Sequence, residues 1–189
     1  MQVNIIGPEK SHLTLEYVKL FGNGDTFVET GTYLGDTVQL AIEAGYKKIH
    51  SIELDDGLFY SALKLFENNH GVKIWLGDSV DELEKIMALV EGPATFWLDA
   101  HASGHLPGGK SGGSPVLDEL RIIAKHPCKE HTIFINDRRL YGSADWSGVQ
   151  EVDAVKIIQE INPNYNLYVL DGHVPQDIFC ASVKKVEAV

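Results

Sequence analysis

The feature that most constrains the fold is a regular alternation of short apolar runs and helical patterns. Each run is five or six residues long and lacks the strict apolar–polar alternation of a half-exposed strand. Such runs are typical of strands that are covered on both faces of a sheet. They predict strands at residues 25–29, 48–53, 72–76, 94–99 and 131–136.

Helical patterns separate these runs and carry recognisable start signals. Ser79 followed by Glu82 three residues later resembles a capping box. Ser114 before Pro115 is the expected pair of a cap and a first-turn proline. Strand–helix–strand connections of this kind are right-handed and place their strands in parallel. The predicted helices cover residues 37–44, 57–69, 79–90 and 115–126.

The remainder of the chain predicts one more helix and a hairpin. Ser147 and Gln150 are candidate caps for a helix that runs to about Ile161. Two apolar runs, residues 165–170 and 177–183, then flank a turn and predict two antiparallel strands. The residues expected to face inward from the helix are Val152, Val155, Ile158 and Ile161.

These elements together predict an α/β fold, a Rossmann-like doubly wound and mostly parallel seven-stranded sheet with a C-terminal antiparallel hairpin. Residues 1–22 are expected to form an N-terminal helical extension before the first strand. Neither a repeat nor a linker divides the sequence, so residues 1–189 are expected to form a single domain.

Charge and cysteine content narrow the function classes. The chain has 16 Lys and Arg against 27 Asp and Glu, a formal net charge of −11. This balance disfavours nucleic acids and anionic membrane surfaces as partners. Cys128 and Cys180 form no CxxC pair, and no long apolar run or signal-peptide core occurs. We therefore expect a soluble, cytoplasmic protein.

The predicted strands end on acidic residues. In a doubly wound sheet, ligands bind at the carboxyl ends of the strands, near the switch in strand order. A sheet that only packs has no need of a carboxylate at each of these positions, so a ligand site is expected there. The acidic residues at or just after the strand ends are Glu29, Glu53, Asp78, Asp99 and Asp137.

Two phosphate-binding motifs fit the sequence poorly. The dinucleotide motif GxGxxG, aligned at Gly31, would have Tyr33 and Asp36 at its second and third glycine positions. Residues 104–111 match the P-loop pattern GxxxxGK[ST]. A P-loop enters its helix directly after the Lys-Ser pair, whereas here the expected helix starts only at Pro115. The sequence therefore favours neither a dinucleotide nor a nucleoside triphosphate as the ligand.

The segment FVETGTYLGDT resembles the first motif of class I S-adenosylmethionine-dependent methyltransferases, an acidic residue followed by GxGxG. Tyr33 stands where the motif has its middle glycine. Acidic residues then follow at steps of 21 to 25 residues, as in that family. The residues that carry the resemblance are Glu29, Gly31, Gly35, Glu53, Asp78 and Asp99.

The resemblance implies S-adenosylmethionine as cofactor. This donor is cationic at sulfur and has no phosphate, so carboxylates suit its site. Gly31 and Gly35 let the backbone of the turn, including Thr32 and Tyr33, approach the ligand. In this family, the residue corresponding to Glu29 lies near the sulfonium and ammonium groups.

The same resemblance implies roles for two further acidic residues at strand ends. Glu53 is expected to accept hydrogen bonds from both ribose hydroxyls. Asp78 is expected to accept one from the adenine amino group, with Ser79 capping the helix that follows. The alternative for Asp78 is that it is itself the helix cap.

Two segments, FWLDAHASGH and FINDRRLYG, resemble the macrocin and sugar O-methyltransferase branch of this family. That resemblance implies a divalent metal, Mg²⁺, held by Asp99 and Asp137 with Asn136 as a third oxygen donor. His101 is expected to take the proton of the acceptor hydroxyl, beside Asp99. The glycine-rich residues 101–113, which include His105, are expected to form a lid.

The residues after Asp137 allow alternatives. Arg138 or Arg139 could hold an acidic substrate group, or form a salt bridge with a strand-end carboxylate. Tyr141 and Trp146 could form a wall of the acceptor pocket, or pack in the core.

The function expected from the sequence is methyl transfer from S-adenosylmethionine to a hydroxyl of a small molecule, with a divalent metal as possible assistant. The alternatives are a metal-free N-methyltransferase and a non-catalytic nucleotide-binding regulatory domain. The short N-terminal segment leaves little room for a substrate domain. Either the acceptor is small, or a second subunit completes the pocket in a homo-oligomer.

Overall fold

The computed structural model describes residues 13–100 and 113–186, and its strands form one seven-stranded mixed sheet in the order β3-β2-β1-β4-β5-β7-β6. β1 to β5 are parallel to one another, and β7 pairs antiparallel with β5 and β6. The predicted fold class is confirmed. The strands are β1 (Thr26–Thr30), β2 (Lys48–Glu53), β3 (Val72–Leu76), β4 (Ala94–Leu98), β5 (Thr132–Ile135), β6 (Asn166–Leu170) and β7 (Ile178–Ser182).

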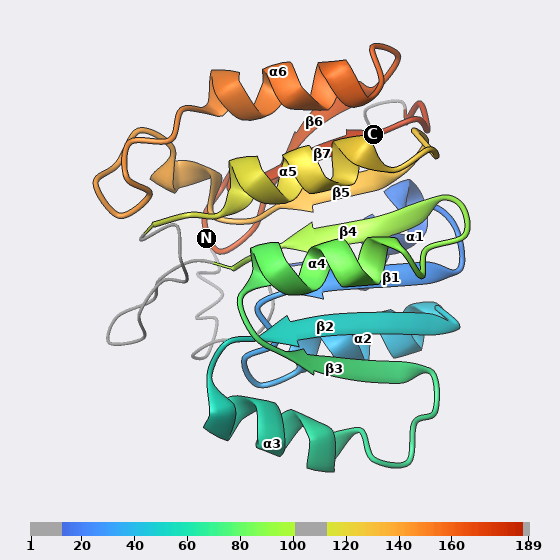
Figure 1. Ribbon diagram of the computed structural model, residues 1–189. Helices are drawn as coiled ribbons and strands as arrows, with labels where there is room; N and C mark the ends of the chain where they lie inside the picture. The colour runs from blue at the N-terminus through green and yellow to red at the C-terminus, as the bar shows by residue number, and fades with distance from the viewer. Residues whose placement is uncertain (1–12, 101–112, 187–189) are drawn as a thin grey trace, which may run out of the picture.

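Helices cover both faces of the sheet. The cluster that contains the inward residues of α4, α5 and α6 lies on one face, and the cluster that contains those of α1, α2 and α3 lies on the other (Figure 1). The strand order changes direction between β1 and β4, which are neighbours in the sheet. The helices are α1 (Leu15–Phe21), α2 (Asp36–Ala44), α3 (Asp56–Leu65), α4 (Ser79–Met87), α5 (Val116–Lys125) and α6 (Glu151–Ile161), with a short 3₁₀ helix η1 (Arg138–Leu140).

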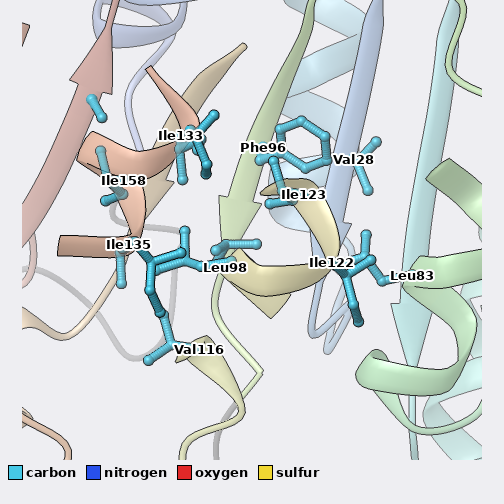
Figure 2. Close-up of a cluster of buried hydrophobic side chains, with 14 of the residues drawn as sticks. Val28, Leu83, Phe96, Leu98, Val116, Ile122, Ile123, Ile133, Ile135 and Ile158 are labelled. Atoms are coloured by element: carbon cyan, nitrogen blue, oxygen red, sulfur yellow. The ribbon is translucent and has the colours of Figure 1, made fainter. Parts of the chain in front are cut away.

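The core follows from the strand period of two. Val28 of β1 and Phe96 of β4 face α4 and α5, where they pack with Leu83 and Ile123 (Figure 2). Their chain neighbours, such as Trp97, point to the opposite face and join the other cluster. Since both faces are buried, the strands read as continuous apolar runs, which is why they were predictable.

The starts of α4 and α5 differ from the prediction. Asp78, and not Ser79, is the N-cap of α4, and its side chain accepts a hydrogen bond from the Val80 N–H at 2.9 Å. The predicted cap role of Ser79 is therefore wrong. In α5 the cap position is occupied by Pro115, one residue after the predicted cap Ser114. The Ser114 hydroxyl still accepts a hydrogen bond from the Val116 N–H at 3.4 Å.

The buried stripe of α6 is also shifted. Val152, predicted to face inward, is 69% exposed, whereas Ile158 and Ile161 are buried as predicted. Ala154 and Ile157 complete a stripe at positions i, i+3, i+4 and i+7. Val152 lies two residues before that stripe begins, on the solvent side of the first turn.

None of the helices described here is long and apolar enough to span a membrane.

Candidate active site

The carboxyl ends of β1, β2, β4 and β5 lie along one edge of the sheet (Figure 1). In the register of the sheet, Thr30 at the end of β1 is paired with Ile52 of β2 and Leu98 of β4. The residues that follow these positions therefore lie close together. This edge, at the switch in strand order, is the expected place of a ligand in a doubly wound sheet.

The turn after β1 depends on two glycines in the left-handed region. Gly31 has φ +91° and Gly35 has φ +84°, and Tyr33 between them also has positive φ, +47°. The Gly31 N–H donates a hydrogen bond to the Ile52 carbonyl at 2.9 Å. A Cβ at Gly31 would lie 2.9 Å from the Asp99 carbonyl oxygen. The turn is thus packed against the residue that follows β4, and a side chain at Gly31 would not fit there.

Glu29 lies buried beneath this turn, with 1% of its surface exposed. The Ser51 hydroxyl donates to its carboxyl at 2.5 Å, and the Thr32 hydroxyl lies 2.6 Å from that of Ser51. Burial and, to a smaller extent, the charge of Asp99 raise the pKa of Glu29 to about 8, although the hydrogen bonds from Ser51 and Thr37 lower it. Without a ligand, the carboxyl therefore holds a proton at neutral pH.

Glu53 is fixed at the end of β2 by backbone donors. Its Oε2 accepts a hydrogen bond from the Tyr33 N–H at 2.8 Å, and its Oε1 accepts from the N–H groups of Leu54 and Asp55, both at 2.9 Å. The side chain is 6% exposed. Glu53, the residue predicted to bind the ribose, is thus hydrogen-bonded directly to the glycine turn.

At the end of β3, Asp78 serves as the cap of α4 through its Oδ1. This confirms the cap interpretation of Asp78, while its contact with adenine stays a prediction. The Ser79 hydroxyl donates a hydrogen bond to Glu119 of α5.

Asp99 and Asn136 are brought together as predicted. The Asn136 Nδ2 donates to Asp99 Oδ1 at 2.8 Å, and the Asp99 N–H donates to the Thr30 hydroxyl at 3.2 Å. The Asp99 carboxylate is therefore oriented by β5, and its backbone is held by β1.

Asp137, unlike Asp99 and Asn136, forms a salt bridge with an arginine. It is 4% exposed, with φ +54°, and pairs with Arg139 at 2.6 Å. Arg139 also pairs with the fully buried Asp177, and Arg138 pairs with Glu151 at 2.9 Å. For Arg139 the predicted salt bridge with a strand-end carboxylate is present, whereas Arg138 pairs with Glu151 at the start of α6.

The residues predicted to hold Mg²⁺ do not fit that ion in this arrangement. Asp137 is neutralised by a guanidinium, and one oxygen of Asp99 is occupied by an amide N–H. Magnesium needs several oxygen ligands at short distance, and a bonded cation at one of them opposes its binding. Within residues 13–100 and 113–186, no three His, Cys, Asp or Glu side chains are grouped as metal ligands.

The structure adds Glu119, which the sequence analysis missed. This α5 residue is 1% exposed and accepts hydrogen bonds from Ser79 and Thr30. Burial raises its pKa to about 7, and the charges of Asp78 and Asp99 contribute in the same direction. A signal existed in the sequence, because Glu119 interrupts the apolar stripe formed by Val116, Leu120 and Ile123.

A small pocket lies where α5 meets the ends of β4 and β5. Trp146, 3% exposed, both packs in the core and lines this pocket, and its ring meets that of Tyr141 edge-on at 4.8 Å. Leu98, Val116 and Ile135 lie together at one end of the buried cluster (Figure 2). The described residues lining the pocket are Leu98, Asp99, Ala100, Ser114, Val116, Glu119, Ile135 and Trp146.

The predicted base His101, the neighbouring His105 and the rest of residues 101–112 lie outside the described residues. The predicted lid and the P-loop-like segment fall in the same stretch.

No protein-family model matches the sequence, and the search of curated proteins found no match. Solved structures do resemble the fold. An O-methyltransferase of Bacillus cereus in complex with SAH is similar with a TM-score of 0.59 at 14% identity, over 89% of this chain and 78% of that one.

Two other solved structures with a similar fold are a methyltransferase and a spermidine synthase. The SAH-bound methyltransferase PaMTH1 of Podospora anserina gives a TM-score of 0.55 at 15% identity, over 85% of this chain and 72% of its own. A spermidine synthase of Thermotoga maritima gives 0.58 at 11% identity, over 88% of this chain and 55% of its own. At these identities the likeness concerns the fold. The chain has the Rossmann-like α/β fold that these methyltransferases share.

Proposed function

We propose that the protein transfers a methyl group from S-adenosylmethionine to a hydroxyl of a small molecule. The observation that carries this proposal is the arrangement of three carboxyl groups, those of Glu29, Glu53 and Asp99, around the turn that begins at Gly31. The donor has a sulfonium and an ammonium group and no phosphate. Acidic side chains beside this turn suit such a cation and would repel a pyrophosphate.

Each residue has a distinct role in donor binding. Glu53, held by three backbone N–H groups, presents its carboxylate to the ribose hydroxyls without having to reorganise. Gly31 and Gly35 allow the left-handed backbone of the turn that would lie under the donor. Glu29 lies beneath the turn, where it can ionise when a positive charge arrives.

The transfer itself is an in-line displacement. A lone pair of the acceptor oxygen attacks the methyl carbon, the carbon–sulfur bond breaks, and its electron pair stays on sulfur to give S-adenosylhomocysteine. Asp99, oriented by Asn136, is placed to position the acceptor hydroxyl. His101 is proposed to take the hydroxyl proton. Much of the rate enhancement would come from holding oxygen and methyl in line.

The likeness to O-methyltransferase structures supports the hydroxyl as acceptor. The more specific resemblance to the macrocin and sugar branch rests on the segments around Asp99 and Asp137. Because Asp137 is paired with Arg139, the proposed transfer does not depend on a metal ion. Turnover measured with and without EDTA tests whether the reaction needs a metal ion.

The proposed function is tested by calorimetric titration with S-adenosylmethionine, NAD and ATP in parallel. We expect only S-adenosylmethionine to bind. Glu53→Gln should weaken it at least tenfold, about 1.4 kcal/mol, because an amide cannot accept the ribose hydroxyls and three N–H groups together. Asp56→Asn is the control, since Asp56 is an exposed acid on the helix that follows β2.

Binding of ATP or NAD in place of S-adenosylmethionine would contradict the proposal. Equal affinity for the donor in Glu53→Gln and wild type would remove Glu53 from the site. Once an acceptor is found, the position of the transferred methyl group on the product separates O- from N-methylation.

A further inference from the structure

The sheet ends at β6, whose outer edge is open. Among the described strands β6 pairs only with β7, so the backbone groups on its outer side have no strand partner there. Its sequence, NLYVL, has no charged residue and no proline. Natural edge strands are commonly protected by a lysine, a proline or a bulge, because an open edge pairs with other strands. β3, at the opposite edge, has such a residue in the exposed Lys73.

An apolar surface reaches this open edge. Leu167 and Val169 are 37% and 42% exposed. In the sheet they lie beside Ala181 and Phe179 of β7, which belong to the buried cluster that contains the inward residues of α5 and α6. Tyr168 between them points to the other face. The apolar layer on the α6 side of the sheet therefore continues to the last strand, where it meets water (Figure 1).

The charges next to the two ends of β6 differ in sign. The exposed Asp171 follows the carboxyl end of the strand. At the amino end, Asn166 is paired with Ser182 of β7, and the exposed Lys184 and Lys185 follow shortly after. Two copies of β6 that pair antiparallel about a two-fold axis bring the acidic end of each copy to the basic end of the other. A second copy of this chain therefore matches the edge in both apolar surface and charge.

We propose that the protein forms a symmetric homodimer through β6, which joins two seven-stranded sheets into one continuous sheet. The two-fold axis passes beside Tyr168, the middle residue of β6, because this register pairs every residue of the strand. Leu167 of each copy then lies opposite Val169 of the other, and the four side chains cover one another.

This arrangement leaves both candidate active sites open. Because the paired strands run antiparallel, the carboxyl edges of the two sheets point in opposite directions. Dimer formation is therefore independent of the methyl transfer proposed above, and either can be disproved without the other.

Sedimentation equilibrium of the full chain, from about 1 to about 100 μM, measures the dimer. We expect wild type to dimerise reversibly in this range. Val169→Lys and Leu167→Glu should each raise the dissociation constant at least about tenfold, because each places two charges in the apolar contact. An equimolar mixture of the two variants should recover the dimer, because this register sets the introduced lysine of one chain opposite the introduced glutamate of the other.

Leu63→Lys is the matched control. Leu63 is 40% exposed, much like Val169, but belongs to α3, which packs against β3 at the other edge of the sheet. This variant should dimerise like wild type. Thermal unfolding of each variant shows that it is folded, and Val169→Lys should bind S-adenosylmethionine with the affinity of wild type.

Backbone hydrogen exchange of wild type tests the same edge without a substitution. The amides on the outer side of β6 should exchange more slowly at high protein concentration than at low concentration, whereas those of β3 should not change. Such a difference supports pairing through the backbone of β6.

Four results would overturn the inference. Wild type could stay monomeric up to about 100 μM. Val169→Lys could dimerise as tightly as wild type, which would place the contact on another face. The outer amides of β6 could exchange slowly in a monomer, which would assign the edge to a segment of the same chain. Failure of the mixed variants to recover the dimer would exclude the pairing of Leu167 with Val169.

Discussion

Two glutamates at neighbouring strand ends show how residue environment divides the work of the site. Glu29 and Glu53 are both buried, at 1% and 6% exposure. The Glu53 carboxyl accepts hydrogen bonds from three backbone N–H groups. The hydrogen bonds to Glu29 come from the hydroxyls of Ser51 and Thr37 among the residues that the structure describes, and burial raises its pKa to about 8. Glu53 is thus already held in place by backbone donors, whereas Glu29 must lose a proton before it can attract a cation.

Donor binding should therefore release a proton from Glu29. A sulfonium or ammonium group nearby lowers the pKa of Glu29 from about 8, so at pH 7 most of one proton leaves. Calorimetric titration with S-adenosylmethionine in phosphate and in Tris, which differ in ionisation enthalpy, measures this release. The observed enthalpy should differ between the buffers for wild type and much less for Glu29→Gln. Equal wild-type enthalpies would show that Glu29 does not respond to the donor.

Gly31→Ala should harm both stability and donor binding. At φ +91° any side chain is strained, and here the new Cβ would lie 2.9 Å from the Asp99 carbonyl oxygen. Gly45→Ala is the control, because its φ is +92° and nothing lies within 4 Å of its Cβ. In urea unfolding we expect a loss of about 1 kcal/mol for Gly45→Ala and roughly 1–3 kcal/mol more for Gly31→Ala. Equal losses would mean that the turn can move away from β4.

At the scale of elements, two histidines tie together the ends of α4, β4 and α5. The Ala94 N–H donates to His131 Nδ1 at 3.1 Å, so the proton of the neutral ring lies on Nε2 and is donated to His126 Nδ1, also at 3.1 Å. His126 Nε2 in turn donates to the Val90 carbonyl at 3.0 Å. This chain of donors works only with neutral rings.

Acid should weaken this junction. Burial lowers the pKa of His131 to about 4 from the ordinary 6.5, and the charges of His126 and Lys129 lower it too. Below pH 6.5 the unfolded ring gains a proton that the folded ring does not, so stability falls as the pH falls. Between pH 7 and pH 5, the free energy of unfolding of wild type should fall about 1–2 kcal/mol more than that of His131→Gln. The exposed His70→Gln is the control and should follow wild type; parallel curves for wild type and His131→Gln would refute this reading.

The elements themselves were predictable where one local pattern dominates. Strands buried on both faces give unbroken apolar runs, and all seven were found within one or two residues. The cap of α4 was misplaced because Asp78 and Ser79 are both good caps and stand side by side. Val152 was misplaced because a valine early in the helix fits more than one apolar stripe.

The site was predictable only in part, because its partners are distant in sequence. The strand ends brought Glu29, Glu53 and Asp99 to one edge, as the topology requires. The pairing of Arg139 with Asp177 depends on how β7 returns beside β5, which no local pattern encodes. Glu119 was missed because an acid within an apolar stripe gains its meaning only from what it faces.

For the whole molecule, the buried acids make stability depend on pH. The pKa values of Glu29 and Glu119 are raised to about 8 and about 7 from the ordinary 4.5. At a pH between the ordinary value of 4.5 and the raised pKa, each carboxyl is ionised in the unfolded chain and protonated in the folded protein. The free energy of unfolding therefore falls as the pH rises. The net charge of −11 adds repulsion in the same direction.

The ligand-free protein should therefore be less stable at pH 8 than at pH 6. We expect its free energy of unfolding to fall on the order of 2 kcal/mol over this range, measured by urea unfolding. The double variant Glu29→Gln and Glu119→Gln should flatten the curve. Stability that holds or rises from pH 6 to pH 8 would mean that both carboxyls are ionised in the folded protein.

The central claim is that the acids at the sheet edge and the glycine turn form one site for a cationic methyl donor. A crystal structure of the protein grown with S-adenosylmethionine tests it most directly. We expect the donor over the turn from Gly31 to Gly35, with its ribose hydroxyls on Glu53 and its methyl group directed toward Asp99. Donor density elsewhere on the molecule, with this turn empty, would contradict it.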